Sequence, residues 1–221
     1  MKCLSFEIEG IYFNCFRKPT STSTIVSYSI PPFTTIRGVL SNCLGLGQFP
    51  RHEEYLLLQD EIKIGIQKIA IKGISKELSK ILKLKKTGSG FRRVFPSSPM
   101  FREFLVNPEY KVYVLGNNEK IEDISKKLKN PERPLYLGQS DDMVDITNIK
   151  TIKTEKTESK KIHSVVEGIY ENCEIVKIPY KFGNDGKSLQ ELTISLPMGY
   201  PLIIDEKVEC YKCDDEYITA Y

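Results

Sequence analysis

The sequence has few of the residues that carry most enzyme chemistry. Its 221 residues include no Trp, two His and six Cys. No local sequence motif pairs His52 or His163 with a nucleophile, so each is expected to be a surface or hydrogen-bonded histidine. Gly-rich phosphate loops of the GxGxxG or GxxxxGK[ST] type are also missing. The pattern favours a protein that is not an enzyme and holds no cofactor.

The six cysteines, at positions 3, 15, 43, 173, 210 and 213, are too scattered for a disulfide framework. Cys210 and Cys213 have the spacing of a zinc knuckle, but a second pair is missing, so no metal site is expected. Asp141, Asp142 and Asp145 could form a magnesium site, but one isolated acidic turn is more typical of a helix cap. We therefore expect a protein of a reducing, cytoplasmic compartment.

Long apolar runs are lacking as well. The mean hydropathy is -0.29, and no apolar run approaches the roughly 18 residues that span a bilayer. The N-terminus, MKCLSFEIEG, alternates polar and apolar residues and is not a secretory signal. With 40% hydrophobic residues and a net charge of +3, the chain is also not disordered as a whole. Its length fits one sizeable domain or a medium domain with a small appendage.

The small net charge conceals an uneven distribution. The stretch from Lys63 to Lys111 holds 12 basic and 3 acidic residues, a local charge of +9, which leaves −6 for the rest of the chain. Such a separation is expected where one face meets a polyanion. An ordinary solvated Lys-rich surface explains the same numbers equally well.

Periodicity predicts the main elements. Strands are expected over residues 2–9, 61–72 (with a bulge near Gln67), 110–116 and 143–152. Helices are expected from Thr34 or Thr35, as side-chain caps, to a stop at Gly45, and over 119–129. Residues 74–84 have apolar residues at helical spacing and predict a short basic amphipathic segment.

This order of elements is βαββαβ, which predicts an α+β, ferredoxin-like fold of the type found in RNA-recognition motifs. We expect this domain to cover residues 1–152, with an inserted thumb at about 74–108. The polar stretch KTEKTESKK then separates a small β-rich domain, 153–221, with four short strands.

The excursion at 88–108 has the composition of a nucleic-acid-binding segment. Arg side chains neutralise phosphates, and Phe rings stack on unpaired bases. Both kinds of residue alternate here, so RNA binding is favoured, although the Phe residues could instead anchor a loop to the core. The candidate RNA-binding residues are Phe91, Arg92, Arg93, Phe95 and Arg102.

Two segments resemble a known family. FRKPTSTSTIVSYSIPPFTTIRGVLSNCLGL (16–46) carries an Arg-x-Pro, a Tyr-containing strand, Pro-Pro, Thr-Thr-Ile, a Gly in the first helix and Leu-Gly-Leu. PLYLGQSDDMVDI (134–146) carries an LGxS-acidic stretch between the second helix and the last strand. Both are similar to CRISPR-associated (Cas) protein family five, the subunit that caps the guide-RNA 5′ end in type I Cascade complexes.

The resemblance implies a repeat-associated mysterious protein (RAMP) fold and binding of the CRISPR RNA 5′ handle. It implies contacts with the Cascade backbone subunit (family seven) and the large subunit, an indirect role at target DNA, and no membrane contact. The helix start would offer N–H groups to a phosphate, with Arg37 adding charge. The handle-binding residues implied in this segment are Arg17, Lys18, Tyr28, Thr34, Thr35 and Arg37.

Two alternatives stay open. One branch of the family processes the guide itself, using a Tyr, a Lys and a His. Tyr28 has a plausible place for that role, but no adjacent Lys-His pair lies in the basic region, so a repeat-RNA endoribonuclease is the second hypothesis. The third is a protein-interaction module whose basic face meets an acidic partner.

Overall fold

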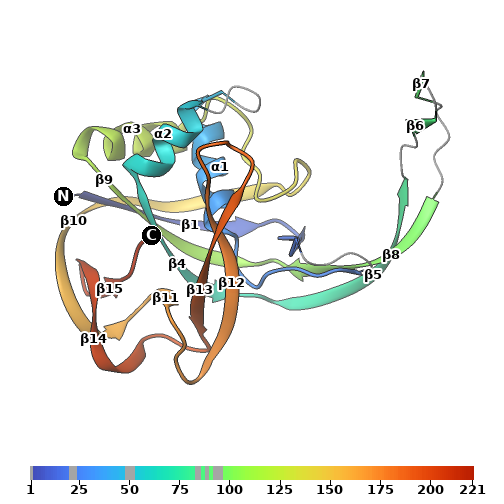
Figure 1. Ribbon diagram of the computed structural model, residues 1–221. Helices are drawn as coiled ribbons and strands as arrows, with labels where there is room; N and C mark the ends of the chain where they lie inside the picture. Colours follow the sequence, from blue (N-terminus) through green and yellow to red (C-terminus); the bar gives the residue numbers. More distant parts are fainter. Residues whose placement is uncertain (1, 20–23, 48–52, 83–85, 88–89, 92–96) are drawn as a thin grey trace.

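A six-stranded antiparallel sheet forms the centre of the molecule (Figure 1). The structure is a computed structural model, and it describes residues 2–19, 24–47, 53–82, 86–87, 90–91 and 97–221. In spatial order the strands are β15 (Glu216–Ile218), β14 (Leu202–Cys213), β10 (Val144–Ile162), β1 (Lys2–Gly10), β9 (Glu109–Gly116) and β4 (Lys63–Ala70). The expected bulge in β4 occurs as a register shift between Lys68 and Ala70.

Three helices lie over one face of this sheet (Figure 1): α1 (Phe33–Leu44), α2 (Glu53–Glu61) and α3 (Asn118–Lys129). Along the chain α1 and α2 separate β1 from β4, and α3 separates β9 from β10, so the expected strand and helix order is present with one extra helix, α2. Ile121 and Ile124 of α3 are fully buried, as their spacing predicts. Gly45 ends α1 with a φ of 72°, which a glycine adopts without strain. No helix of the described residues has the length and apolar character needed to cross a membrane.

The opposite face of the sheet is also covered, which the alternation in β1 did not predict. Cys3 is fully buried there, beside Tyr113 and Leu115 of β9. The side chains that cover them come from the end of the chain, Cys213 in β14 and Ile218 in β15. A buried cysteine behaves as a small apolar residue, so the end of β1 that carries Cys3 can be buried on both faces.

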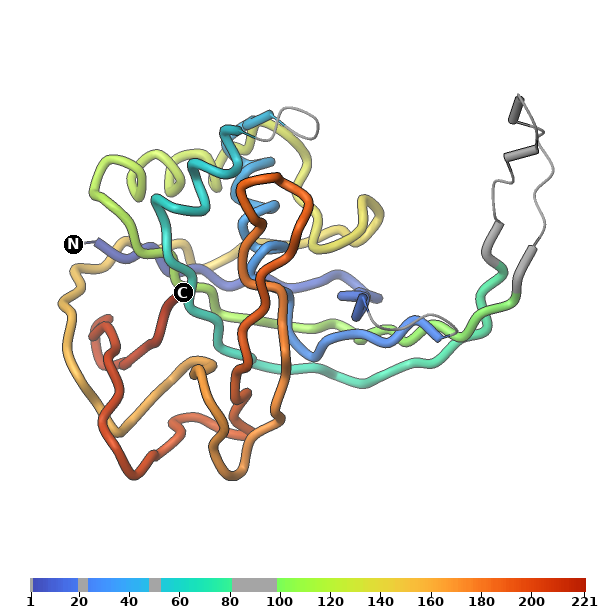
Figure 2. The backbone as a smooth tube through the Cα atoms, in the orientation of Figure 1, coloured from blue at the N-terminus to red at the C-terminus, as the bar shows by residue number. Residues whose placement is uncertain are grey.

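A long hairpin of β5 (Gly73–Leu82) and β8 (Ser97–Val106) projects from the body, as Figure 2 shows. Residues 73–82 pair with 97–106 without a register shift. The prediction of a helical segment at 74–84 was therefore wrong. Ile74 and Leu78 are four residues apart, which places them on one side of a helix but also on one side of a strand. They are 61% and 64% exposed, because the hairpin has no helix against this face.

Shorter strands complete the hairpin. β2 (Phe13–Asn14) pairs antiparallel with β8, and β3 (Thr24–Ile25) pairs parallel with it. Towards the tip, β6 (Lys86–Thr87) pairs with β7 (Gly90–Phe91).

The C-terminal third shares its core with the rest of the chain. The boundary expected at residue 152 falls inside β10, so KTEKTESKK is strand rather than linker. A second sheet of β11 (Val166–Glu167), β13 (Leu189–Pro197) and β12 (Cys173–Phe182) follows. Together with β14, these are the four strands predicted for this region. Ile178 and Ile194 join Leu4 and Phe33 in one hydrophobic cluster, so the second sheet packs directly on α1.

Candidate nucleic-acid interface

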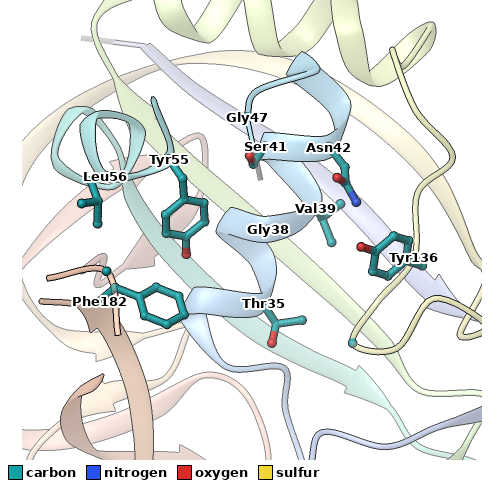
Figure 3. Close-up of a pocket in the computed structure, with 12 residues that line it drawn as sticks. Thr35, Gly38, Val39, Ser41, Asn42, Gly47, Tyr55, Leu56, Tyr136 and Phe182 are labelled. Carbon is teal, nitrogen blue, oxygen red and sulfur yellow. The ribbon is translucent and has the colours of Figure 1, made fainter. Parts of the chain in front are cut away.

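A pocket of about 300 Å³ opens along the outer side of α1 (Figure 3). Gly38 lies at its centre, where an added Cβ would have no heavy atom within 4 Å. Figure 3 shows Tyr55 and Phe182 on one side of α1 and Tyr136 on the other. Hydroxyl and amide side chains of α1 supply its polar lining: Thr35, Ser41 and Asn42.

The aromatic side of the pocket is held by hydrogen bonds between α2 and β12. The Tyr55 hydroxyl donates to the Thr34 carbonyl at 3.1 Å, and its ring lies 5.6 Å from that of Phe182. Gln59 fixes Phe182 from both sides, since its amide donates to the Phe182 carbonyl and accepts from the Phe182 N–H. Burial raises the pKa of Tyr55, so the phenol is neutral and serves as a donor.

A loop from Leu137 to Asp142 joins this pocket to the strands at the base of the hairpin. Asn14 donates to the Leu137 carbonyl at 3.4 Å, and the Cys15 N–H donates to the Asp142 carboxylate at 3.5 Å. Gly138, at the edge of the pocket, has a φ of 108°, a conformation that strongly favours glycine. Asp142 is thus an anchor for this loop, and burial raises its pKa.

The basic pair Arg17 and Lys18 follows Cys15 closely in the chain. Arg17 is exposed, and its backbone forms an isolated antiparallel β-bridge with Ser27. The Lys18 ammonium lies 5.4 Å from the centre of the Tyr28 ring. Tyr28 itself is only 4% exposed and belongs to the hydrophobic core. The expectation that Tyr28 contacts RNA, or acts as a nucleophile, is therefore not met by its position.

Arg37 also differs from its expected role. Its side chain is fully buried and donates to the carbonyls of Tyr180 at 2.6 Å and Tyr221 at 2.9 Å. The guanidinium lies 5.5 Å from the Tyr180 ring centre, and its Nε has no partner among the described residues. Arg37 ties α1 to β12 and to the end of the chain, so the prediction that it adds charge at an RNA surface was wrong.

The start of α1 is capped differently from the prediction. Pro32 occupies the N-cap position, and no side chain of the described residues accepts a hydrogen bond there. Thr34 and Thr35 lie inside the first turn and are half-buried. Thr35 lines the pocket, whereas Thr34 contributes the carbonyl that holds Tyr55.

Arg102 is the predicted thumb residue that the structure describes in full. The Arg102 guanidinium lies 4.4 Å from the Phe104 ring centre, and the ring centres of Phe104 and Phe13 are 5.6 Å apart. The Arg102 Nε has no hydrogen-bond partner among the described residues. Phe91 lies in β7, while Arg92, Arg93 and Phe95 lie outside the described residues.

The basic stretch from Lys63 to Lys111 does not share a single face. Lys63 and Lys111 point to the far side of the sheet, where Lys111 donates to Glu216 at 2.5 Å and Lys63 lies over the Tyr211 ring. Lys76 is on the hairpin, with Glu103 at 3.7 Å. The hairpin therefore carries only part of the positive charge of the stretch from Lys63 to Lys111.

The remaining candidate residues form no catalytic group within the described part of the chain. His163 accepts a hydrogen bond from the Tyr217 N–H at its Nδ1, and burial lowers its pKa. His52 lies outside the described residues. Cys210 and Cys213 belong to two different hydrophobic clusters, and among the described residues no group of three His, Cys, Asp or Glu has the arrangement of a metal site.

Sequence reasoning missed the aromatic lining of the pocket. Tyr136 lies inside the LGxS segment, but no role was assigned to it. Tyr55 lies on α2, which was not predicted, and Phe182 reaches the pocket only through the packing of β12 on α1. A helix face with small residues at Gly38 and Ser41 was the available signal, because such a face leaves room for a ligand.

The architecture defines an α+β protein whose fold occurs in CRISPR-associated proteins. It is similar to a chain of a CRISPR RNA-guided surveillance complex, at 13% identity and a TM-score of 0.59, over 89% of this chain and 91% of that one. It is also similar to a CRISPR protein from Archaeoglobus fulgidus, at 13% identity and a TM-score of 0.58, over 99% and 98% of the two chains. A comparison with curated proteins found no match.

Residues 3–195 match the family of CRISPR-associated protein (Cas_Cas5). The match covers most of the chain, including α1, the hairpin and the LGxS loop. The chain belongs to this family.

Proposed function

We propose that this chain is a non-catalytic guide-RNA-binding subunit of a type I Cascade surveillance complex, where it caps the 5′ handle of the CRISPR RNA. The observation that carries the proposal is the α1 pocket together with the 137–142 loop at its edge, which is hydrogen-bonded to Asn14 and Cys15 beside the base of the projecting hairpin. Family membership and the likeness to a surveillance-complex chain support it.

The pocket suits an unpaired base. Its volume is at the lower end of ligand pockets, which run from about 300 to 1,000 Å³. Tyr55, Tyr136 and Phe182 offer aromatic surface, and sequence-specific RNA recognition commonly combines such rings with polar groups that read base edges. Thr35, which also lines the pocket, can supply such a polar group.

Phosphates would be bound outside the pocket. Arg17 is exposed, and Arg102 in β8 is a proposed contact on the hairpin. Arg92 and Arg93, which lie outside the described residues, stay proposed contacts on the basis of the sequence. In this arrangement the hairpin is a RAMP thumb that lies across the guide. The backbone subunit (family seven) and the large subunit would contact other faces, and target DNA would be met through the guide.

Absence of catalysis is part of the proposal. Burial of Tyr28 and the Tyr217 contact of His163 both support it. Incubation with a full repeat transcript should leave that RNA intact on a denaturing gel. Cleavage would instead make the chain a repeat-processing endoribonuclease.

Gly38 allows a direct test of the pocket. Leucine at this position has space and favours the helix, yet it fills the pocket that a base would enter. Base stacking contributes about 1–3 kcal/mol, so Gly38→Leu should bind handle RNA about 5- to 150-fold more weakly. Gly38→Ala is the matched control and should bind like the wild type. Equal affinity of the wild type for handle RNA and for an unrelated RNA of the same length would contradict the proposal.

A further inference from the structure

A second concave surface is lined by two turns at the end of the C-terminal strands. Figures 1 and 2 show these turns on the side of the molecule away from the helices. It has a volume of about 490 Å³ and is formed by the turn between β11 and β12 and the turn between β13 and β14. We refer to it as the 169–205 groove. The residues on which the inference rests are Ile169, Glu171, Met198, Gly199, Ile203 and Asp205.

Three large apolar side chains of the groove face solvent. Ile169 is 77% exposed, Met198 is 74% exposed and Ile203 is 67% exposed. Exposed large apolar residues are ordinary when they are isolated, but three that line one concavity mark an interaction site. Beneath them Leu202 and Ile204 are buried, so the groove rests on a formed hydrophobic cluster.

Hydrogen bonds hold the two turns in place. The Met198 N–H donates to the Asn172 carbonyl at 3.2 Å, which joins one turn to the other. Ser195 accepts from the Tyr170 N–H and donates to the Gly168 carbonyl, each at 2.9 Å. The apolar side chains are therefore displayed on a fixed frame, which reduces the entropy lost when a partner binds.

The charge of the groove selects the partner. Glu171 and Asp205 line it, and none of the Lys and Arg residues that the structure describes does. Two carboxylates repel phosphates, so RNA is disfavoured here, whereas Lys or Arg side chains next to apolar ones complement this lining. We propose that the 169–205 groove docks a basic amphipathic segment of a partner protein, whose apolar side chains contact Ile169, Met198 and Ile203. This surface is separate from the proposed RNA interface and does not depend on it.

The test uses the full chain and three helical peptides of one length. The first presents a Leu face and a Lys face, the second replaces Lys with Glu, and the third replaces Leu with Ser. Fluorescence anisotropy should show binding of the Leu/Lys peptide and much weaker binding of the other two. Equal or tighter binding of the Leu/Glu peptide would overturn the charge assignment, and equal binding of the Ser/Lys peptide would overturn the apolar one.

Gly199 supplies the blocking variant. An added Cβ there meets no heavy atom within 4 Å, and Gly199 lines the groove, so we expect the ring of Gly199→Trp to occupy part of it. It should weaken the Leu/Lys peptide by about tenfold or more, as expected for loss of a buried apolar contact. Gly73→Trp, also in open space but on the hairpin, is the matched control and should have no effect on peptide binding.

Two further measurements complete the test. Gly199→Trp should keep the wild-type melting temperature in circular dichroism, which shows that the fold is intact. Sedimentation should give one species for both proteins. If the wild type is a dimer and Gly199→Trp is a monomer, the proposal is overturned and the groove is assigned to a second copy of the chain. If Gly199→Trp binds the Leu/Lys peptide as the wild type does, the groove is not the peptide site.

Discussion

Replacement of Arg37 by Met tests whether this arginine stabilises the fold or binds RNA. The buried guanidinium donates to the carbonyls of Tyr180 and Tyr221. A hydrogen bond from a charged donor contributes about 1.5–3 kcal/mol to stability, and removing the guanidinium leaves each of the two carbonyls without this hydrogen bond. The unpartnered Nε and the cost of burying a charge offset part of this. We expect Arg37→Met to lower the free energy of unfolding by about 3 kcal/mol.

Thermal unfolding followed by circular dichroism measures this effect. For a chain of 221 residues, about 3 kcal/mol corresponds to a fall in Tm of about 6–12 °C. Arg17→Met, at an exposed position, should change stability by no more than about 0.5 kcal/mol but should weaken RNA binding. The reasoning would be refuted if Arg37→Met melted like the wild type and lost RNA binding, because that pair of results would place Arg37 on the RNA surface.

Two further predictions concern the end of the chain. A Cβ on Gly65 would lie 2.8 Å from the Thr219 carbonyl oxygen, so Gly65→Ala should lower the free energy of unfolding, measured in urea, by about 1–3 kcal/mol. Gly73→Ala is the control, because a Cβ on Gly73 meets nothing within 4 Å. Equal stability of the two variants would contradict this prediction. His163 has a lowered pKa in the folded state, mainly through burial, so its contribution to stability is present above the ordinary pKa of 6.5 and is lost as the pH falls below it. His163→Asn keeps an acceptor for the Tyr217 N–H but does not titrate. The free energy of unfolding of this variant should therefore depend less on pH than that of the wild type between pH 7.5 and about 5. Identical slopes for the variant and the wild type would show that His163 does not cause the pH dependence.

Local pattern was enough to predict the elements whose partners lie in the core. The apolar spacing of α3, the stop at Gly45 and the strands β1, β4 and β9 were read correctly, because each element has one strongly apolar face. The same periodicity predicted the chain order of strands and helices, and the family resemblance added the expected handle-binding residues. Both kinds of evidence depend on residues near one another in sequence.

The failures have a common physical origin in distant contacts. Ile74 and Leu78 fit a helix and a strand equally well, and only pairing with β8 decides between them. Arg37 looked like a surface charge because nothing near it in sequence reveals the carbonyls of Tyr180 and Tyr221. The polar stretch KTEKTESKK looked like a linker, yet it is an alternating strand that pairs with β14.

The candidate site was predicted in part. Thr35 and Arg17 were both among the expected handle-binding residues; Thr35 lines the pocket and Arg17 is exposed, and their contacts with RNA stay predictions. Tyr55 and Phe182 could not be placed, since their meeting depends on how α2 and β12 pack around α1.

The central claim is that RNA enters the α1 pocket and continues along the hairpin. Photo-cross-linking with a 4-thiouridine-substituted RNA that carries the repeat-derived handle, followed by mass spectrometry of the cross-linked peptides, tests it most directly. The account predicts cross-links on the peptides that contain Tyr55, Tyr136 or Phe182 and on the hairpin. Cross-links confined to β14 and the 169–205 groove, with none at the pocket, would contradict it.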